Sequence, residues 1–233
     1  MTSTKKIIKK KLKEPDEFVT ATERSYLFVT HHFKPMAVGA GIVLVLLLLI
    51  FFFQRWENKN AEDANQIFNS AVETYQRVSS PYREGSLQEY KNVLERFNEV
   101  ILKFPKTSAG RLAVLYKGNI LLRLGEFDEA IKPYEGYLEK AGGKKLYRAF
   151  AMQGLGYAYE GKKDYEKART TYQKVIDLGE DFQLANAYLG LGRCCEKLGK
   201  TKEALEGYKN FIKVSQKSQM TNIVLRKISN LEK

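Results

Sequence analysis

The chain has 233 residues and a formal net charge of +12 at pH 7, from 39 lysines and arginines against 27 acidic residues. Its two histidines, His31 and His32, lie near the start, so a Ser–His or Cys–His nucleophile is excluded from the rest of the chain. The positive charge divides between a lysine-rich head and lysines scattered singly along the remainder. We therefore expect no nucleic-acid site.

The head, residues 1–35, carries eight basic residues, six of them lysines before position 14. The lysine cluster suits attraction to anionic lipid. Pro15, Asp16 and Glu17 are typical of a helix start, because proline fits the first turn and carboxylates oppose the N-terminal dipole. Apolar residues then recur at helical spacing as far as Phe33. This pattern predicts either a short helix lying on a membrane surface or an unstructured linker.

Residues 36–54 form the most apolar segment, and no charged residue stands between Lys34 and Arg55. As a helix, this segment would rise about 27 Å, close to the hydrocarbon thickness of a bilayer. A buried helix of a soluble protein is the alternative, but such a helix rarely lacks a polar side. The run is longer than a signal-peptide core, and bulky phenylalanines stand where small residues would permit cleavage. We therefore predict an uncleaved transmembrane signal-anchor.

The charges beside this segment predict its orientation in the membrane. Only Arg55 and Lys59 follow it closely, whereas the head is rich in lysine, and basic flanks resist translocation. We expect the N-terminus in the cytoplasm and the C-terminal part outside it, with Trp56 in the interfacial aromatic belt.

Residues 55–110 show two helical patterns on either side of a turn-rich break. Apolar residues recur at helical spacing in 61–79 and in 87–104, and the run SSPYREG separates them. Pro105 follows the second pattern. We predict a degenerate first helix pair in this region.

The rest of the chain is one unit repeated three times, which we place at residues 111–144, 149–182 and 185–218. Each unit has a glycine, an alanine twelve residues later and a tyrosine four residues after that: Gly118, Ala130 and Tyr134; Gly156, Ala168 and Tyr172; Gly192, Ala204 and Tyr208. The spacing predicts two antiparallel helices per unit. The small residues should stand where the backbones approach, and the tyrosine should fill the gap to the next unit. We expect residues 219–233 to form a capping helix.

The order small, small, aromatic resembles the tetratricopeptide repeat. The resemblance implies an all-α fold, with one transmembrane helix followed by an α-solenoid of about three to four helix–turn–helix repeats and a capping helix. The units depart from the family pattern at Val114, Met152 and Tyr188, which stand where a tryptophan is usual. The proline that closes the family's repeat is also absent from these three units.

Nothing in the repeats points to catalysis, so we expect no enzyme, no cofactor and no metal site. Adjacent side chains on a helix point about 100° apart, which makes His31 and His32 a poor metal pair. The same geometry would strain a disulfide between Cys194 and Cys195, so we predict two buried free thiols.

What remains is a binding surface, which in such repeats follows the first helix of each unit. Counting from the glycines, we predict nine exposed positions: Leu115, Asn119, Arg123, Gln153, Tyr157, Glu160, Leu189, Arg193 and Lys197. Their mixture of apolar, amide and basic groups suits a peptide segment or a partner loop. A clamp for a C-terminal carboxylate is disfavoured, because Leu115 and Tyr157 stand where it needs polar donors. The same positions could instead hold the chain's own capping helix or a second copy.

The order of segments resembles the single-span bacterial tetratricopeptide proteins typified by the ancillary subunit of the SecYEG translocon. The resemblance rests on the head, the signal-anchor, the pair Arg55–Trp56, the repeats and the closing run Lys227–Leu231. It implies an inner-membrane protein with periplasmic repeats, whose partners are the Sec translocon, a periplasmic chaperone or exported chains. The alternatives left open are a scaffold for cell division, outer-membrane assembly or polymer export, and a mainly structural homo-oligomer.

Overall fold

The computed structural model describes residues 17–80, 85–140, 144–215 and 218–233, which contain nine helices and no strand. The chain divides into two compact units, Met1–Glu57 and Asn58–Lys233. The lysine cluster of the predicted head and the centre of the predicted break between the first two helical patterns lie outside the described residues.

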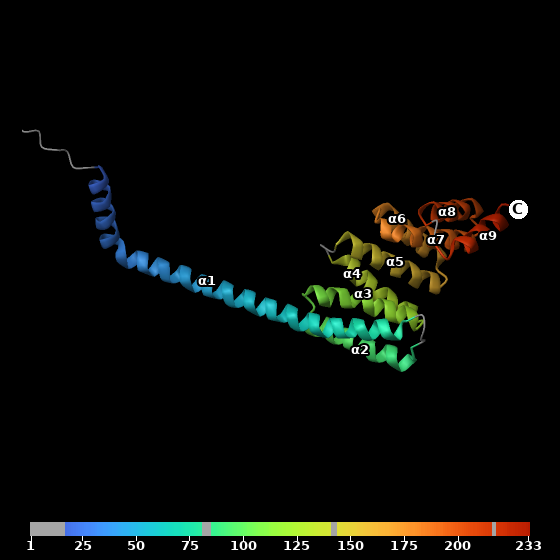
Figure 1. Cartoon of the computed structure of the whole chain (residues 1–233), viewed down its shortest axis with the longest axis horizontal. Helices are drawn as coiled ribbons and strands as arrows, with labels where there is room; N and C mark the ends of the chain where they lie inside the picture. The colour runs from blue at the N-terminus through green and yellow to red at the C-terminus, as the bar shows by residue number, and fades with distance from the viewer. Residues whose placement is uncertain (1–16, 81–84, 141–143, 216–217) are drawn as a thin grey trace, which may run out of the picture. The chain divides into compact units, whose positions relative to one another are not determined.

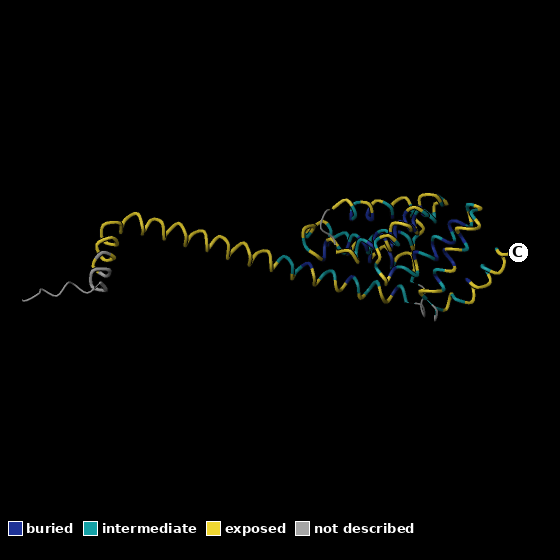
Figure 2. The backbone as a smooth tube through the Cα atoms, turned by 90° about the horizontal axis from the view of Figure 1, so that it is seen from above, coloured by how far each residue is buried: buried dark blue, intermediate teal, exposed yellow. Residues whose placement is uncertain are grey.

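Helix α1 (Glu17–Val78) runs through the apolar segment, with Pro35 inside it (Figure 1). The segment before the apolar run is thus helical from Glu17 and continuous with that run, and its position on a membrane surface stays a prediction. Between Ser25 and Val78 the most apolar 18-residue window has a mean hydropathy of 3.0, and none of it is buried against protein (Figure 2). The helix is long and apolar enough to cross a bilayer, a test that a signal sequence would also pass.

The second unit is a stack of helix pairs in chain order (Figure 1). The end of α1 packs with α2 (Leu87–Lys103). Three pairs and a final helix follow: α3 (Ser108–Arg123) with α4 (Phe127–Glu139), α5 (Lys145–Gly161) with α6 (Tyr165–Leu178), α7 (Asp181–Lys197) with α8 (Thr201–Val214), and then α9 (Thr221–Leu231). From α2 onward each helix contacts the next one, and α5 also contacts α3 and α7. The fold of this unit is therefore an α-solenoid, whose core lies between successive pairs.

Local sequence determines where several of these helices begin and end. Ser86 accepts a hydrogen bond from the main chain of Glu89, whose carboxylate accepts one from the Ser86 amide, so α2 starts with a capping box. Between the helices of each repeat, one residue adopts a left-handed conformation: Gly125, Lys163 or Gly199, with φ of 75°, 63° and 72°. Each of these residues lies in the turn between the two helices of its unit.

The glycines and tyrosines of the repeats pack against one another. A Cβ atom at Gly118 would lie 2.5 Å from the ring of Tyr134, and one at Gly156 would lie 2.5 Å from that of Tyr172. At Gly118 and Gly156 the expectation of an opposing backbone is therefore wrong, because each of these two glycines faces a tyrosine ring. A second glycine, Gly154, meets the Tyr134 ring from the following repeat, at 2.3 Å. The Tyr134 ring thus joins two units, as predicted.

The same pattern holds in the third repeat, where a Cβ atom at Gly192 would lie 2.6 Å from the ring of Tyr208. The predicted close approach of two backbones also occurs at Gly192, because a Cβ atom added at Gly207 of α8 would lie 2.9 Å from the amide nitrogen of Gly192. The three alanines of the predicted set, Ala130, Ala168 and Ala204, are fully buried.

The first helix pair replaces this glycine–tyrosine packing with an aromatic cluster. Phe68 of α1 contacts Phe97 of α2 edge to face, and the ring of Tyr116 in α3 stacks on Phe97 with 4.9 Å between centroids. Tyr75 lies edge-on to Tyr116 as well. Aromatic side chains bury much apolar area, so the cluster can hold α1 and α2 to the first repeat without the repeat motif.

Candidate functional site

The solvent-facing side chains of α3, α5 and α7 are together called the first-helix surface below. Six of the nine predicted positions contribute to it. Asn119, Arg123, Tyr157 and Lys197 are exposed, and Glu160 and Arg193 are half-buried.

The other three positions, Leu115, Gln153 and Leu189, are buried, so the expectation that they are exposed is wrong. They occupy one repeat position, three residues before each glycine. A first helix packs on its own second helix and also on the first helices of neighbouring repeats. Only a narrow part of its circumference therefore remains free, and these positions fall outside that part.

Gln153 is the polar member of this buried position. Among the described residues, neither its amide nitrogen nor its amide oxygen has a hydrogen-bond partner. An unpaired buried amide costs free energy, so Gln153 is a weak point of the packing between α3, α5 and α7.

Two predicted residues on neighbouring repeats bind each other. Arg193 of α7 donates two hydrogen bonds to the Glu160 carboxylate of α5, at 2.6 and 2.8 Å. The hydroxyl of Tyr172 donates to the same carboxylate at 2.9 Å. Burial alone would lower the pKa of Arg193, but the hydrogen bonds and charge of Glu160 outweigh it and raise that pKa. Glu160 and Arg193 therefore hold the repeats together before any partner arrives.

An equivalent cluster joins the last repeat to the capping helix. Lys227 of α9 donates to the Glu196 carboxylate at 2.7 and 3.0 Å, and the hydroxyl of Tyr208 donates to it as well. Burial alone would raise the pKa of Glu196, but the hydrogen bonds from Lys227 and Tyr208 outweigh it and lower that pKa. Lys227 of the closing run thus pairs with Glu196 in the same way that Arg193 pairs with Glu160 between repeats.

Three of the predicted residues keep free polar groups. Asn119 accepts a hydrogen bond from the Tyr134 hydroxyl through its amide oxygen, at 2.6 Å, which leaves its amide nitrogen as a donor. The hydrogen bond to Tyr75 raises the pKa of Arg123, although burial opposes it, and Lys197 is exposed at the end of α7. Because Glu160 and Glu196 are paired internally, the polar groups left on this surface are mainly donors and cations.

A cavity of about 290 Å³ opens beside Asn119 on the same surface. Its walls come from four helices and are mostly aromatic: Tyr75, Leu112, Leu115, Tyr116, Asn119, Tyr134, Tyr147 and Phe150. Leu115 and Asn119 are among the nine predicted binding positions, and Tyr134 was predicted as a repeat-packing residue; the other five were not predicted. Such a cavity can accept a large apolar side chain and exclude water from it.

Two exposed aromatic side chains extend this apolar area toward the start of α7. Phe150 is 37% exposed and Phe182 is 73% exposed, and their rings lie 5.9 Å apart. Sequence analysis missed both. Extending the count one turn before Gln153 and two turns before Leu189 would have found them. Phe150 occupies the repeat position of Leu112, and Phe182 occupies that of Leu146.

The cysteines are placed as expected: Cys194 and Cys195 are both fully buried and free. In the part of the chain that the structure describes, no group of three histidine, cysteine or acidic side chains could hold a metal ion.

Comparison with known proteins identifies the repeats. Residues 110–181 and 154–210 match two models of the tetratricopeptide repeat, so this part of the chain consists of tetratricopeptide repeats. Tetratricopeptide repeat protein 29 of Macaca fascicularis is 30% identical over 102 residues, which cover 41% of this chain but only 22% of that relative. Repeats of this kind are suited to binding other proteins.

Solved structures show the same fold at low sequence identity. MamA from Desulfovibrio magneticus RS-1 superposes with a TM-score of 0.52 at 20% identity, over 70% of this chain and 80% of that one. A tetratricopeptide repeat protein from Parabacteroides merdae gives 0.55 at 16% identity, over 72% and 60%. At these identities the likeness concerns the fold alone.

Proposed function

We propose that this protein is a membrane-anchored tetratricopeptide scaffold of the bacterial cell envelope, and that its first-helix surface binds segments of partner proteins. The observation that carries the proposal is the aromatic cavity beside Asn119, with the cation Arg123 on the same helix. An apolar side chain of the partner would fill the cavity, and the partner's main chain or an acidic group would meet Asn119 and Arg123. The role requires no catalysis, cofactor or metal.

The exposed apolar part of α1 supports the membrane anchor. A protein in water rarely exposes a large continuous apolar surface, and here the whole 18-residue window is uncovered. A bilayer would cover it. The basic head favours a cytoplasmic N-terminus, which would place the repeats in the periplasm.

The resemblance to the ancillary SecYEG subunit supports a role beside the Sec translocon, assisting the secretion or folding of exported proteins. The partners would then be the translocon, a periplasmic chaperone or the exported chains themselves. A scaffold for another envelope machine and a mainly structural oligomer would use the same fold, so the partner has to be captured.

Site-specific crosslinking in living cells tests the binding surface. A photoreactive residue replaces Phe150 in the cavity wall, and a control places it at Lys132 on α4, whose side chain is 69% exposed. We expect capture from position 150 and none from position 132. Equal capture from both positions would contradict the assignment of the first-helix surface.

The identity of the captured protein separates the alternatives. Translocon subunits, exported chains or a periplasmic chaperone would support the secretion role. Division, outer-membrane assembly or polymer-export proteins would move the same scaffold to another machine, and capture of copies of this chain alone would favour a structural oligomer.

The proposed topology is tested by labelling Lys202→Cys, an exposed position in α8, with a membrane-impermeant maleimide on spheroplasts. Burial raises the pKa of Cys194 to about 12 and that of Cys195 to about 11, so the native thiols should not react. We expect labelling of intact spheroplasts. Labelling only after the membrane is opened would place the repeats in the cytoplasm instead.

A further inference from the structure

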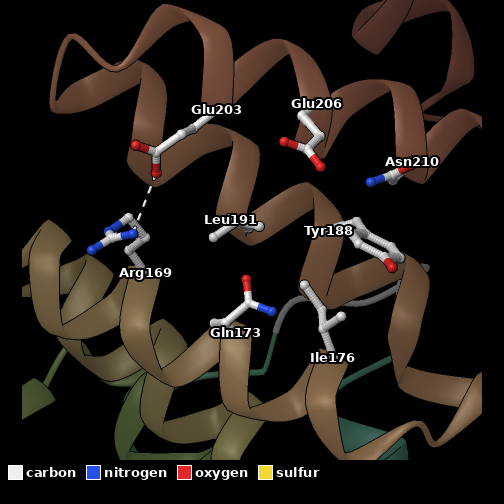
Figure 3. Close-up of a pocket in the computed structure, with 9 residues that line it drawn as sticks. Arg169, Gln173, Ile176, Tyr188, Leu191, Glu203, Glu206 and Asn210 are labelled. Carbon is white, nitrogen blue, oxygen red and sulfur yellow. Dashed lines mark hydrogen bonds and ion pairs between the residues drawn. The ribbon is translucent and has the colours of Figure 1, made fainter.

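A second surface lies on the second helices of the repeats. Between α6 and α8, above α7, is a cavity of about 210 Å³ (Figure 3). Its floor and one wall are apolar, from Leu191 and Tyr188 of α7 and Ile176 of α6. Gly207 of α8 also borders this cavity, called the slot below, and packs closely on the backbone of α7.

Acceptor groups stand around this apolar slot. Among the described residues, the carboxylate of Glu206 has no hydrogen-bond or ion-pair partner, and in Figure 3 it points into the gap between α6 and α8. Gln173 donates its amide nitrogen to Asp177 at 2.9 Å, so its amide oxygen remains free, and that oxygen points toward Leu191 in the same view. The slot therefore presents one free carboxylate and one free carbonyl.

One end of the slot is already closed by a cation of the chain itself. Arg169 donates to Glu203 across the gap at 3.3 Å and to Glu166 at 3.0 Å (Figure 3). Glu203 is thus neutralised, while Glu206, one turn further along α8, is not. The structure already shows that an arginine from α6 can reach a carboxylate of α8 in this groove.

We propose that this slot binds an arginine side chain of a partner protein. The aliphatic part of the side chain would lie along Leu191 and Ile176, and the guanidinium would donate to Glu206 and to the Gln173 oxygen. A planar guanidinium can also stack on the ring of Tyr188. A purely apolar ligand would leave Glu206 desolvated and unpaired, and an acidic one would be repelled by it.

The positive net charge of the chain does not oppose this assignment at physiological salt. Charges separated by more than about 8 Å are largely screened there. The carboxylate inside the slot therefore outweighs lysines elsewhere on the surface.

The groove one repeat earlier is a natural control. Between α4 and α6 lies an equivalent cavity of about 360 Å³, with Leu155 where Leu191 stands. Thr170 occupies the position of Glu206, Thr171 that of Gly207, and Lys174 that of Asn210. The two carboxylates of this groove are already engaged, Glu135 by the Tyr159 hydroxyl and Glu166 by Arg169 and Lys200. With no carboxylate at the Glu206 position and an added cation at Lys174, this groove should not bind arginine.

Nuclear magnetic resonance of the methyl groups of the full chain in nanodiscs tests the assignment, with N-acetyl-arginine methylamide as the probe. We expect millimolar probe to shift the methyl signals of Leu191 and Ile176 but not those of Leu155, with a response that weakens as salt is added. The citrulline analogue, which has nearly the same shape without the charge, should give no shift. Equal shifts from citrulline, or from Leu155, would overturn the proposal, and an equal response to the lysine analogue would overturn the choice of arginine.

A matched pair of variants completes the test. Glu206→Gln should raise the half-saturating probe concentration about tenfold, because it removes the charged acceptor. Thr170→Val, at the equivalent position of the control groove, should leave it unchanged. Glu206 is exposed, so both variants should keep the circular dichroism of the unmodified protein, and an unchanged response in Glu206→Gln would also overturn the proposal.

Discussion

Compared along the array, the contacts that join the helices repeat from unit to unit, whereas the side chains that line the grooves change. The ring of Tyr172 covers Gly156 and Gly190 as the ring of Tyr134 covers Gly118 and Gly154. The groove position that is Glu206 in the third repeat is Thr170 in the second. The repeated positions therefore carry the fold, and the varied positions are where recognition can differ.

The largest expected effect comes from breaking a repeated contact. Gly156→Leu would place its Cβ 2.5 Å from the ring of Tyr172, between α5 and α6. We expect a loss of roughly 2–4 kcal/mol in the free energy of unfolding and a fall in Tm of about 10 °C. Thermal denaturation followed by circular dichroism measures this. Gly118→Leu and Gly192→Leu should behave alike if the contact is equivalent in all three repeats.

A glycine outside this contact provides the control. A Cβ atom at Gly136 in α4 would meet nothing within 4 Å. Gly136→Ala should therefore stabilise the protein by about 0.5–1 kcal/mol, because glycine in a helix interior costs backbone entropy. A similar loss of stability at Gly136 and Gly156 would contradict the role given to the tyrosine rings.

The next prediction compares two ion pairs: the one between Glu160 and Arg193 inside the array, and the one between Glu196 and Lys227 at its end. Glu160→Gln leaves the half-buried Arg193 without its carboxylate and should cost roughly 1.5–3 kcal/mol in the free energy of unfolding. Glu196→Gln breaks the ion pair with Lys227, but only α9 lies beyond that contact, so the loss of stability should be confined to α9. Hydrogen exchange resolved by segment separates the two. Glu99→Gln, in an exposed pair with Lys103, should change neither.

Acid should weaken the contact between Glu196 and Lys227, and the effect should again be confined to α9. The pKa of Glu196 lies below its ordinary value of 4.5, so its contribution is complete above that pH and is lost as the pH falls through the lowered value. Val224 of α9 is fully buried, and its methyl signals report whether α9 is docked. We expect these signals to be stable at pH 6 and to broaden or shift below about pH 4. Loss already above pH 5 would contradict control by Glu196.

The sequence predicted the repeated interior well, because spacing alone identifies it. Gly156, Ala168 and Tyr172 recur at fixed intervals, and their burial follows from helix periodicity. The sequence predicted less well which positions of the binding surface are exposed. Whether Leu189 or Phe182 is exposed depends on how neighbouring first helices cover each other, and that arrangement is not contained in the periodicity of one helix.

Pairings between units were also out of reach of the sequence. Arg193 was predicted to face a partner, yet it binds Glu160, 33 positions earlier in the chain. An ion pair at that separation depends on the rise and rotation from one repeat to the next. The free carboxylate of Glu206 is comparable: α8 has two acidic residues, and the structure shows that the other one, Glu203, is already paired.

The smallest expected effect tests an exception to the repetition itself. Lys163 adopts φ of 63° at the turn where the other repeats have Gly125 and Gly199. A side chain in this conformation costs about 1–2 kcal/mol, part of which glycine returns through the entropy of the unfolded chain. Lys163→Gly should therefore stabilise the protein by about 0.5–1 kcal/mol in chemical denaturation, and Gly199→Lys should destabilise it by a similar amount. If both substitutions lower stability, the Lys163 side chain has a role in the fold that backbone conformation does not explain.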